Sequence, residues 1–199
     1  QKSLDLTDTE LGLLTGIAYA LFYATMAIPL ARIAEHVNRP RMIAICVGIW
    51  SAMTCLCGVA ASFPLLFLCR VGVGFGEAGS YPVSSSVVGD YFPKSERALA
   101  LAVFAIGLSL GGIIGPALAG TLSYYFGWQQ AFIALGVAGL LWVPLVLLTV
   151  RDPKRGALDD DGDRTLRTTP PNFVRCLTIM WRTKSFRYMI VAVGLHAGV

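Results

Sequence analysis

Two ionisable residues, Arg70 and Glu77, lie inside a stretch of apolar and small residues that runs from Pro64 to Val88. An ionised side chain at membrane depth costs at least about 2.5 kcal/mol, so it persists where it faces a polar cavity and has a function there. Seven residues correspond to almost two helical turns, which places both side chains on one helix face, about 10 Å apart along the axis. Gly74 lies between them and leaves space. This spacing predicts a cavity in which Arg70 and Glu77 bind a solute and Glu77 exchanges a proton.

The composition indicates a membrane protein. Of the 199 residues, 55% are hydrophobic and 14% are charged, whereas soluble domains carry about 25% charged residues. Because a bilayer-spanning helix needs about 20 apolar residues, we expect an all-α integral membrane protein with spans at 11–33, 42–61, 64–89, 97–125 and 128–150. The apolar segment 184–199 is expected to start a further span. A soluble bundle this apolar would need buried helices on every side.

Charged and neutral connections alternate along the chain. Basic residues follow the first and third spans and recur throughout 151–187, whereas the connections at 61–64 and 126–129 carry no charge. Since basic loops remain in the cytoplasm, we expect the charged connections to be cytoplasmic and the membrane to be the bacterial inner (plasma) membrane. The polar segment 151–183 is expected to be a cytoplasmic linker. The bundle itself would occupy residues 1–150.

The sequence does not favour other kinds of chemistry. The run Gly74-Phe75-Gly76-Glu77-Ala78-Gly79 matches the dinucleotide-binding pattern, but it lies within an apolar span and lacks the strand that this pattern requires. The aspartates at 159–163 lack the glycine and glutamate positions of a calcium loop. None of the five cysteines forms a C-x-x-C pair, and no Ser/His/Asp set lies within the spans. We therefore expect no cofactor, no metal, no nucleic-acid partner and no enzymatic activity.

Tyrosines and small residues supply further candidates inside the spans. Phenol rings suit a cavity with both polar and apolar walls, although core or interfacial positions would also suit them; the candidate substrate contacts are Tyr19, Tyr23 and Tyr81. Small residues on one helix face allow a neighbouring backbone to approach, and proline removes a backbone hydrogen bond. The candidates for close packing or bending are Gly74, Gly111, Gly115 and Pro116.

The connection after the first span supplies a candidate gate. Arg39 can reach Asp90 if the ends of their helices meet, and such a pair would stabilise one conformation. Glu35 and Arg41 are candidate members of the same network, although these charges would also serve to orient the chain in the membrane. Asn38 is expected in a left-handed turn. At the other end of this span, Thr7 and the glutamate three residues later have the spacing of a capping box.

These patterns resemble the major facilitator superfamily. Its signature between helices two and three, G-x-x-x-D-R-x-G-R, is similar to residues 31–41. Arg39 and Arg41 are retained, whereas the signature has different residues at the positions of Ala31, Glu35, His36 and Asn38. The stretch from Gly111 to Gly120, with Gly115-Pro116, resembles a helix-five motif associated with antiporters. The spinster-like group is indicated by two further runs, Arg70-x-x-x-Gly74-x-x-Glu77-Ala78 and Asp90-Tyr91-Phe92-Pro93. Related organic-anion carriers share the first of these.

The resemblance implies a twelve-helix carrier of two six-helix halves that works by alternating access. This chain would supply helices two to six of the N-terminal half and the start of helix seven, with the first helix missing. The implied partners are the C-terminal half of the same polypeptide, the lipid bilayer, protons and a small-molecule or lipid-like substrate. Proton-coupled movement of a lysolipid-like amphiphile is the first expectation. A small organic-anion symporter, a multidrug exporter and a membrane receptor without transport are the alternatives.

Overall fold

The structure is a computed structural model of the chain. It describes residues 7, 9, 10, 12, 17–156, 158, 178, 179 and 181–188, and leaves out the side chains of residues 17–21. By their contacts the residues form two compact units, Gln1–Leu158 and Asp159–Val199, and each is considered by itself. In the second unit, residues 184–188 are helical. The rest of the expected segment 184–199 lies outside the described residues.

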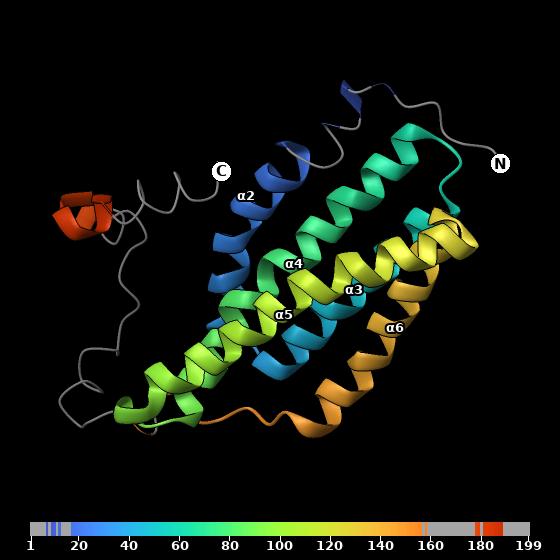
Figure 1. The fold of residues 1–199 in the computed structure, drawn as a ribbon. Coiled ribbons are helices and arrows are strands. Elements are labelled where there is room, and N and C mark those ends of the chain that lie inside the picture. Colours follow the sequence, from blue (N-terminus) through green and yellow to red (C-terminus); the bar gives the residue numbers. More distant parts are fainter. Residues whose placement is uncertain are drawn as a thin grey trace. The chain divides into compact units, whose positions relative to one another are not determined.

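The first unit is built from helices joined by short connections (Figure 1). They are α2 (Ile17–Ala34), α3 (Arg39–Val59), α4 (Phe63–Tyr91), α5 (Lys94–Phe126) and α6 (Trp128–Thr149). Connections this short make consecutive helices run antiparallel. No strand occurs among the residues that the structure describes, and the expected all-α fold is confirmed.

Two helices begin before the apolar spans expected from the sequence. Helix α3 starts at Arg39 instead of residue 42, and α5 starts at Lys94 instead of residue 97. In each case a polar first turn belongs to the helix, and a search for apolar runs does not detect it. At the other end of α4, the helix continues to Tyr91, two residues beyond the expected 89.

Capping interactions explain several of these boundaries. The Thr7 N–H donates to Glu10 Oε2 at 2.9 Å and the Glu10 N–H donates to Thr7 Oγ1 at 3.3 Å, so the predicted capping box is confirmed; the Thr7 N–H also lowers the pKa of Glu10. Asn38 accepts a hydrogen bond from the Arg41 N–H at 3.0 Å and has φ −69°. The left-handed turn expected at Asn38 is therefore wrong, because an N-cap residue takes an extended conformation. Among the described residues, positive φ angles occur at two glycines, Gly127 between α5 and α6, with φ 88°, and Gly156, with φ 62°.

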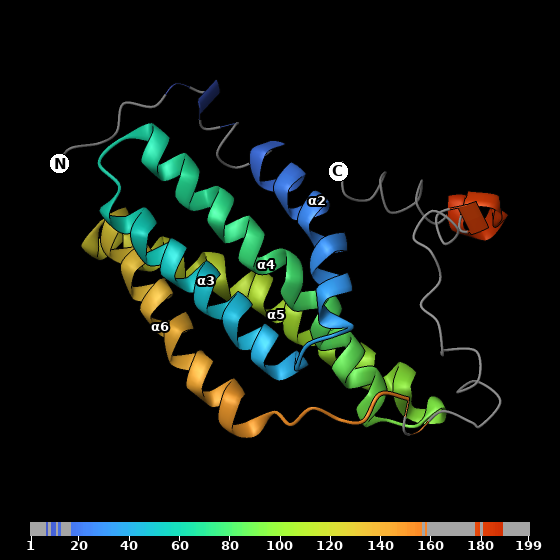
Figure 2. The same cartoon turned by 180° about the vertical axis from the view of Figure 1, so that it is seen from behind.

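Helix α3 lies at the centre of the bundle. It packs against α4 and α6, while α2 packs on α4 and α5 contacts α6 and α4; Figure 2 shows α3 between α4 and α6. Glycines allow the closest approaches. A Cβ added to Gly76 of α4 would lie 2.8 Å from the Cys46 carbonyl oxygen, and one added to Gly136 of α6 would lie 2.7 Å from the Ser51 carbonyl oxygen. Both oxygens belong to the backbone of α3.

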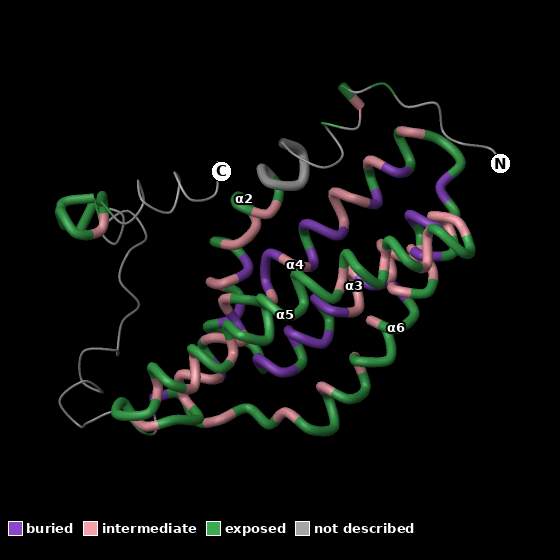
Figure 3. Tube along the Cα trace, in the orientation of Figure 1, coloured by how far each residue is buried: buried purple, intermediate pink, exposed green. Residues whose placement is uncertain are grey.

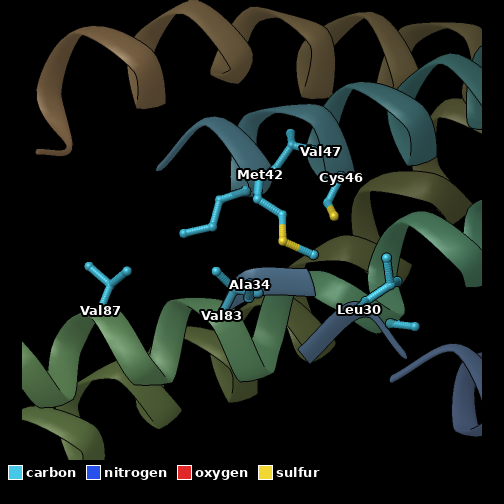
Figure 4. Close-up of a cluster of buried hydrophobic side chains, with 9 residues drawn as sticks. Leu30, Ala34, Met42, Cys46, Val47, Val83 and Val87 are labelled. Carbon is cyan, nitrogen blue, oxygen red and sulfur yellow. The ribbon is translucent and has the colours of Figure 1, made fainter. Parts of the chain in front are cut away.

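The apolar core lies where α2, α3 and α4 meet. Figure 4 shows its side chains, contributed by Leu30 and Ala34 of α2, Met42, Cys46 and Val47 of α3, and Val83 and Val87 of α4. Burial follows the same helices, and α5 has no buried residue (Figure 3). The core therefore joins the ends of α2, α3 and α4 into one block. Helices α5 and α6 have fewer buried residues than α3 and α4.

Three helices, α3, α5 and α6, are long and apolar enough to cross a membrane by length and composition. Helix α4 has 29 residues and is about 43 Å long, which exceeds the thickness of about 30 Å of a bilayer core. It carries Arg70, Glu77 and Asp90. Arg70 and Glu77 lie within its expected span 64–89, away from both helix ends, whereas Asp90 lies near the C-terminal end of the helix.

We predict that Gly136→Ala lowers the stability of the full-length protein by about 1 to 3 kcal/mol, the usual cost of overpacking. The new methyl group would meet backbone atoms of Cys55 and Ser51, which cannot rotate away. Gly48→Ala is the matched control in the same interface, because its Cβ would lie at an ordinary 3.7 Å from Val143. Thermal unfolding in detergent measures both. Equal melting temperatures for the two variants would contradict the close packing of α3 and α6.

Candidate functional site

A cavity of about 890 Å³ opens among the helices of the first unit. This volume lies within the range of about 300–1,000 Å³ found for small-molecule sites. Every helix from α2 to α6 contributes to its wall: Tyr23 from α2, Trp50 from α3, Glu77, Ser80, Tyr81 and Ser84 from α4, Phe104, Gly107, Leu108 and Gly111 from α5, and Trp142 from α6. Because α4 supplies most of the polar groups, it sets the chemistry of the cavity.

The α4 wall is a polar stripe. Glu77, Ser80, Tyr81 and Ser84 follow the spacing i, i+3, i+4 and i+7, which places them on one helix face. They bring a carboxyl group, two aliphatic hydroxyls and a phenol. We call these four residues the polar stripe. Glu77 and Tyr81 were predicted from the sequence, whereas the two serines were missed although their spacing from Glu77 could have indicated them.

The other helices contribute mostly aromatic and aliphatic lining. It includes Trp50, Phe104, Leu108 and Trp142. The rings of Tyr81 and Phe104 stack with centroids 5.8 Å apart and planes 27° from parallel. The cavity therefore has both polar and apolar lining, a combination that suits an amphipathic molecule.

Arg70 does not line this cavity. Its guanidinium carbon lies 5.3 Å from the centroid of the Phe132 ring of α6, a distance suited to a cation–π interaction. Side chains on a helix lean toward its N-terminus, so a long side chain at position 70 reaches away from Glu77. The structure thus does not bring Arg70 and Glu77 into one cavity, although the helical spacing is as expected.

The other predicted cavity residues have mixed outcomes. Tyr23 lines the cavity, as does Tyr81. Tyr19 belongs to α2, but its side chain lies outside the described residues. Binding by any of these tyrosines stays a prediction.

The predicted packing residues also divide. Gly74 is buried within α4. In the described part of the chain, nothing lies within 4 Å of a Cβ added at Gly111 or Gly115, and Gly111 lines the cavity instead. Pro116 lies inside α5 without interrupting it. A packing role for Gly111 and Gly115 stays a prediction, whereas the packing glycines that the structure identifies include Gly76 and Gly136.

A buried charge cluster joins the ends of α3 and α4. Only 2% of the Arg39 side chain is exposed, and its guanidinium forms ion pairs with Asp90 and Asp152. Arg39 Nη1 donates to Asp90 Oδ2 and to Ser86 Oγ, Nε donates to Asp152 Oδ1 at 2.8 Å, and Nη2 donates to the Pro153 carbonyl oxygen at 2.7 Å. The Arg39–Asp90 contact expected from the sequence is confirmed. We call these five residues the charge cluster.

The segment 151–156 holds the charge cluster from outside. Arg155 Nη2 donates to the carbonyl oxygens of Ala34 at 2.7 Å and Val37 at 3.0 Å, at the end of α2, where helix carbonyls lack partners within the helix. The Tyr91 hydroxyl donates to the Arg151 carbonyl oxygen at 2.7 Å. The first residues of the expected linker are therefore bonded to the bundle. Sequence reasoning missed this because the bonded groups are far apart in the chain.

Two candidate gate residues lie outside the charge cluster. Glu35 pairs with Arg32 at 3.8 Å, and both side chains are exposed. Arg41 contributes its backbone N–H to the Asn38 cap, and Arg41 is exposed. Their gating roles stay predictions. Among the described residues, no group of three His, Cys, Asp or Glu side chains could hold a metal ion.

We predict that Arg39→Gln destabilises the full-length protein by about 3 to 5 kcal/mol, because it leaves buried carboxylates without their cation. Asp90→Asn and Asp152→Asn should each cost less, since Arg39 keeps one carboxylate partner. Exchanging the charges of Arg39 and Asp90 should not restore stability, because the new carboxylate would face Asp152. Thermal unfolding in detergent ranks the variants. Full recovery in the exchanged variant would contradict the pairing of Arg39 with both carboxylates.

A sequence profile of the Major Facilitator Superfamily matches residues 1–199. An MFS-type efflux pump of Mycolicibacterium smegmatis is 37% identical over 150 residues, which is 75% of this chain and 35% of that protein. A sphingosine-1-phosphate transporter of Danio rerio is 30% identical over 168 residues, 82% of this chain and 33% of that protein. A protein of Bacillus subtilis named as a probable galactarate/D-glucarate transporter is 32% identical to this chain, which covers 35% of that protein's length. The chain thus spans about a third of the length of the curated relatives it matches.

Solved structures lead to the same family. The chain is similar to a bacterial homologue of the human lysosomal transporter Spinster in an inward-facing, occupied conformation, with a TM-score of 0.71, 41% identity and coverage of 78% of this chain and 39% of that one. The unoccupied form of such a homologue gives a TM-score of 0.72 and 40% identity, over 82% of this chain and 40% of that one. The relatives named here are transporters and not enzymes. The chain belongs to the Major Facilitator Superfamily and is a spinster-like member of it.

Proposed function

We propose that the full-length protein is a secondary active transporter that couples proton movement to transport of an amphipathic, lysolipid-like solute by alternating access. The observation that carries this proposal is the mixed lining of the cavity, which combines the polar stripe of α4 with aromatic and aliphatic side chains of the other helices. A lysolipid has the matching division between a polar head group and an alkyl chain. A sphingosine-1-phosphate transporter among the relatives supports the same substrate class.

Glu77 is the proposed proton site. It is half-buried and is the one acidic residue among those that line the cavity in the described chain. An ionisable group within a membrane span generally marks a substrate or proton pathway. Protonation would remove its negative charge and change how the polar stripe interacts with a head group. Arg70, on the same helix but outside this cavity, would meet an anionic group of the solute only after its side chain leaves the Phe132 ring.

The charge cluster is the proposed gate. Alternating access requires a contact that exists in one conformation and breaks in the other. The charge cluster ties α3 and α4 to the segment after α6, so it can hold these ends together until substrate and proton binding favour another arrangement. We propose that this end faces the cytoplasm of a bacterial cell, since its connections carry the basic residues. The C-terminal half of the polypeptide would provide the opposite wall.

A small organic-anion symporter is the second candidate. Arg70 offers a cation for a carboxylate, and one relative is named as a transporter of galactarate and D-glucarate. The apolar wall of the cavity, with two tryptophans, has no evident use for such polar solutes. A multidrug exporter is the third candidate and would use the same wall without the head-group chemistry; one relative is an efflux pump.

We predict that Glu77→Gln abolishes lysophosphatidylcholine accumulation driven by a pH gradient in liposomes, because glutamine cannot release a proton. Exchange of labelled for unlabelled lysolipid without a gradient should continue, since the shape of the side chain is kept. Glu10→Gln is the matched control: it removes a carboxyl group outside the cavity, and glutamine still serves in a capping box. Gradient-driven accumulation that is unchanged in Glu77→Gln would refute Glu77 as the coupling site.

We predict that Arg70→Ala lowers uptake of lysophosphatidic acid about tenfold more than uptake of zwitterionic lysophosphatidylcholine, as a lost charge-assisted hydrogen bond of about 1.4 kcal/mol would do. Phe132→Leu is the control, because it removes the ring that holds the guanidinium and keeps the cation. Liposome uptake of both lipids measures the ratio. An equal loss for both lipids in Arg70→Ala would mean that Arg70 has a structural role.

A further inference from the structure

A second cavity, of about 560 Å³, lies between the last turns of α4 and the first turns of α5. It shares Phe104 with the main cavity. Its other lining residues are Val88, Phe92, Glu96, Leu99, Ala100 and Val103. The two cavities therefore meet at one aromatic ring and follow the same pair of helices.

The α4 wall changes character where the two cavities meet. Ser84 and Val88 are four residues apart, so Val88 continues the helix face of the polar stripe, and Phe92 follows α4 directly as its extended C-cap residue. The wall is polar from Glu77 to Ser84, where it lines the main cavity, and apolar at Val88 and Phe92, where it lines the second. One side of α4, together with its C-cap residue, thus forms a wall with a polar part and an apolar part.

The α5 wall is apolar along the second cavity. Leu99, Ala100, Val103 and Phe104 line it, and Phe104 stacks on Tyr81 of the polar stripe. From Phe104 to Glu96 the cavity extends about 12 Å along α5. This length and the apolar lining suit an extended alkyl chain.

Among the described residues that line the second cavity, Glu96 is the one that is ionisable. It belongs to the first turn of α5, and it is exposed. The charge therefore lies at the outer rim, and the inner wall has no ionised group to bind an anion or a polar solute. An alkyl chain needs only the apolar wall.

We infer that the second cavity binds the alkyl chain of the amphiphile whose head group lies against the polar stripe. The inference rests on the proposed function and extends it to the orientation of the solute: head group between Glu77 and Ser84, chain past Phe104 toward Phe92. The affinity then depends on chain length, because each buried methylene strengthens binding about fourfold.

Photo-cross-linking of the full-length protein in nanodiscs tests this orientation. One palmitoyl lysophosphatidylcholine probe carries a diazirine at the chain end, and a second carries it on the head group. We expect the chain-end probe to label the second cavity at Val88, Phe92, Leu99 or Val103, and the head-group probe to label the polar stripe. Excess unlabelled lysolipid should remove both signals. Chain-end labelling that persists with competitor would overturn the inference, because it would mark contact with bulk bilayer lipid.

Val103→Trp supplies a second test, because the larger side chain narrows the second cavity. We expect unlabelled palmitoyl lysolipid to compete at least about tenfold more weakly for the head-group probe in this variant, as the loss of two buried methylenes would produce. Octanoyl lysolipid should compete as it does in the wild type. A misfolded variant would lose both, so the comparison of the two chain lengths is its own control.

The outcomes also separate this inference from the proposed function. Competable head-group labelling of the polar stripe, with chain-end labelling elsewhere or with no change in chain-length preference in Val103→Trp, would overturn the inference and leave the proposed function intact. Head-group labelling around Glu96 with chain-end labelling of the main cavity would overturn the orientation. Absence of competable labelling by both probes would overturn the inference and the amphiphile proposal together.

Discussion

The burial of the Arg39 guanidinium is the constraint on which the arrangement of the helix ends depends. A buried cation is tolerated only when carboxylates and hydrogen-bond acceptors surround it. Arg39 obtains them from Asp90 of α4 and from Asp152 and Pro153 after α6. Arg155 of the same segment binds the end of α2. Satisfying one charge therefore fixes the ends of α2, α3 and α4 and the exit of α6 relative to one another.

Helix α4 connects this constraint to the cavity. Ser84 belongs to the polar stripe, and Ser86, two residues later, accepts a hydrogen bond from Arg39. Because Ser84 and Ser86 lie in the same helical turn, a rearrangement of the charge cluster that displaces Ser86 also displaces the nearest residue of the polar stripe. The close contact of Gly76 with the α3 backbone gives α4 a fixed support between its two ends. This geometry provides a physical link between the proposed gate at one end and the proposed binding site in the middle.

The sequence predicted the features that follow from local patterns. Apolar runs predicted the helices, and charge at a helix end predicted the Arg39–Asp90 contact. The helix starts were less predictable, because polar first turns escape a search for apolar residues. Asp152 was missed, since its partner lies 113 residues away in the chain and no spacing rule connects the two. Arg70 shares a helix face with Glu77, yet its long side chain reaches Phe132; spacing determines the face of a helix but not where a flexible side chain ends.

The account as a whole depends on the cavity accepting an amphiphile and on protons driving its movement. The most direct test is uptake by the full-length protein in liposomes under an imposed proton gradient, with lysophosphatidylcholine and galactarate compared in parallel. Accumulation of the lysolipid that requires the gradient, without accumulation of the sugar acid, is the predicted result. Gradient-driven accumulation of galactarate alone would contradict the account and would identify the protein as an organic-anion symporter.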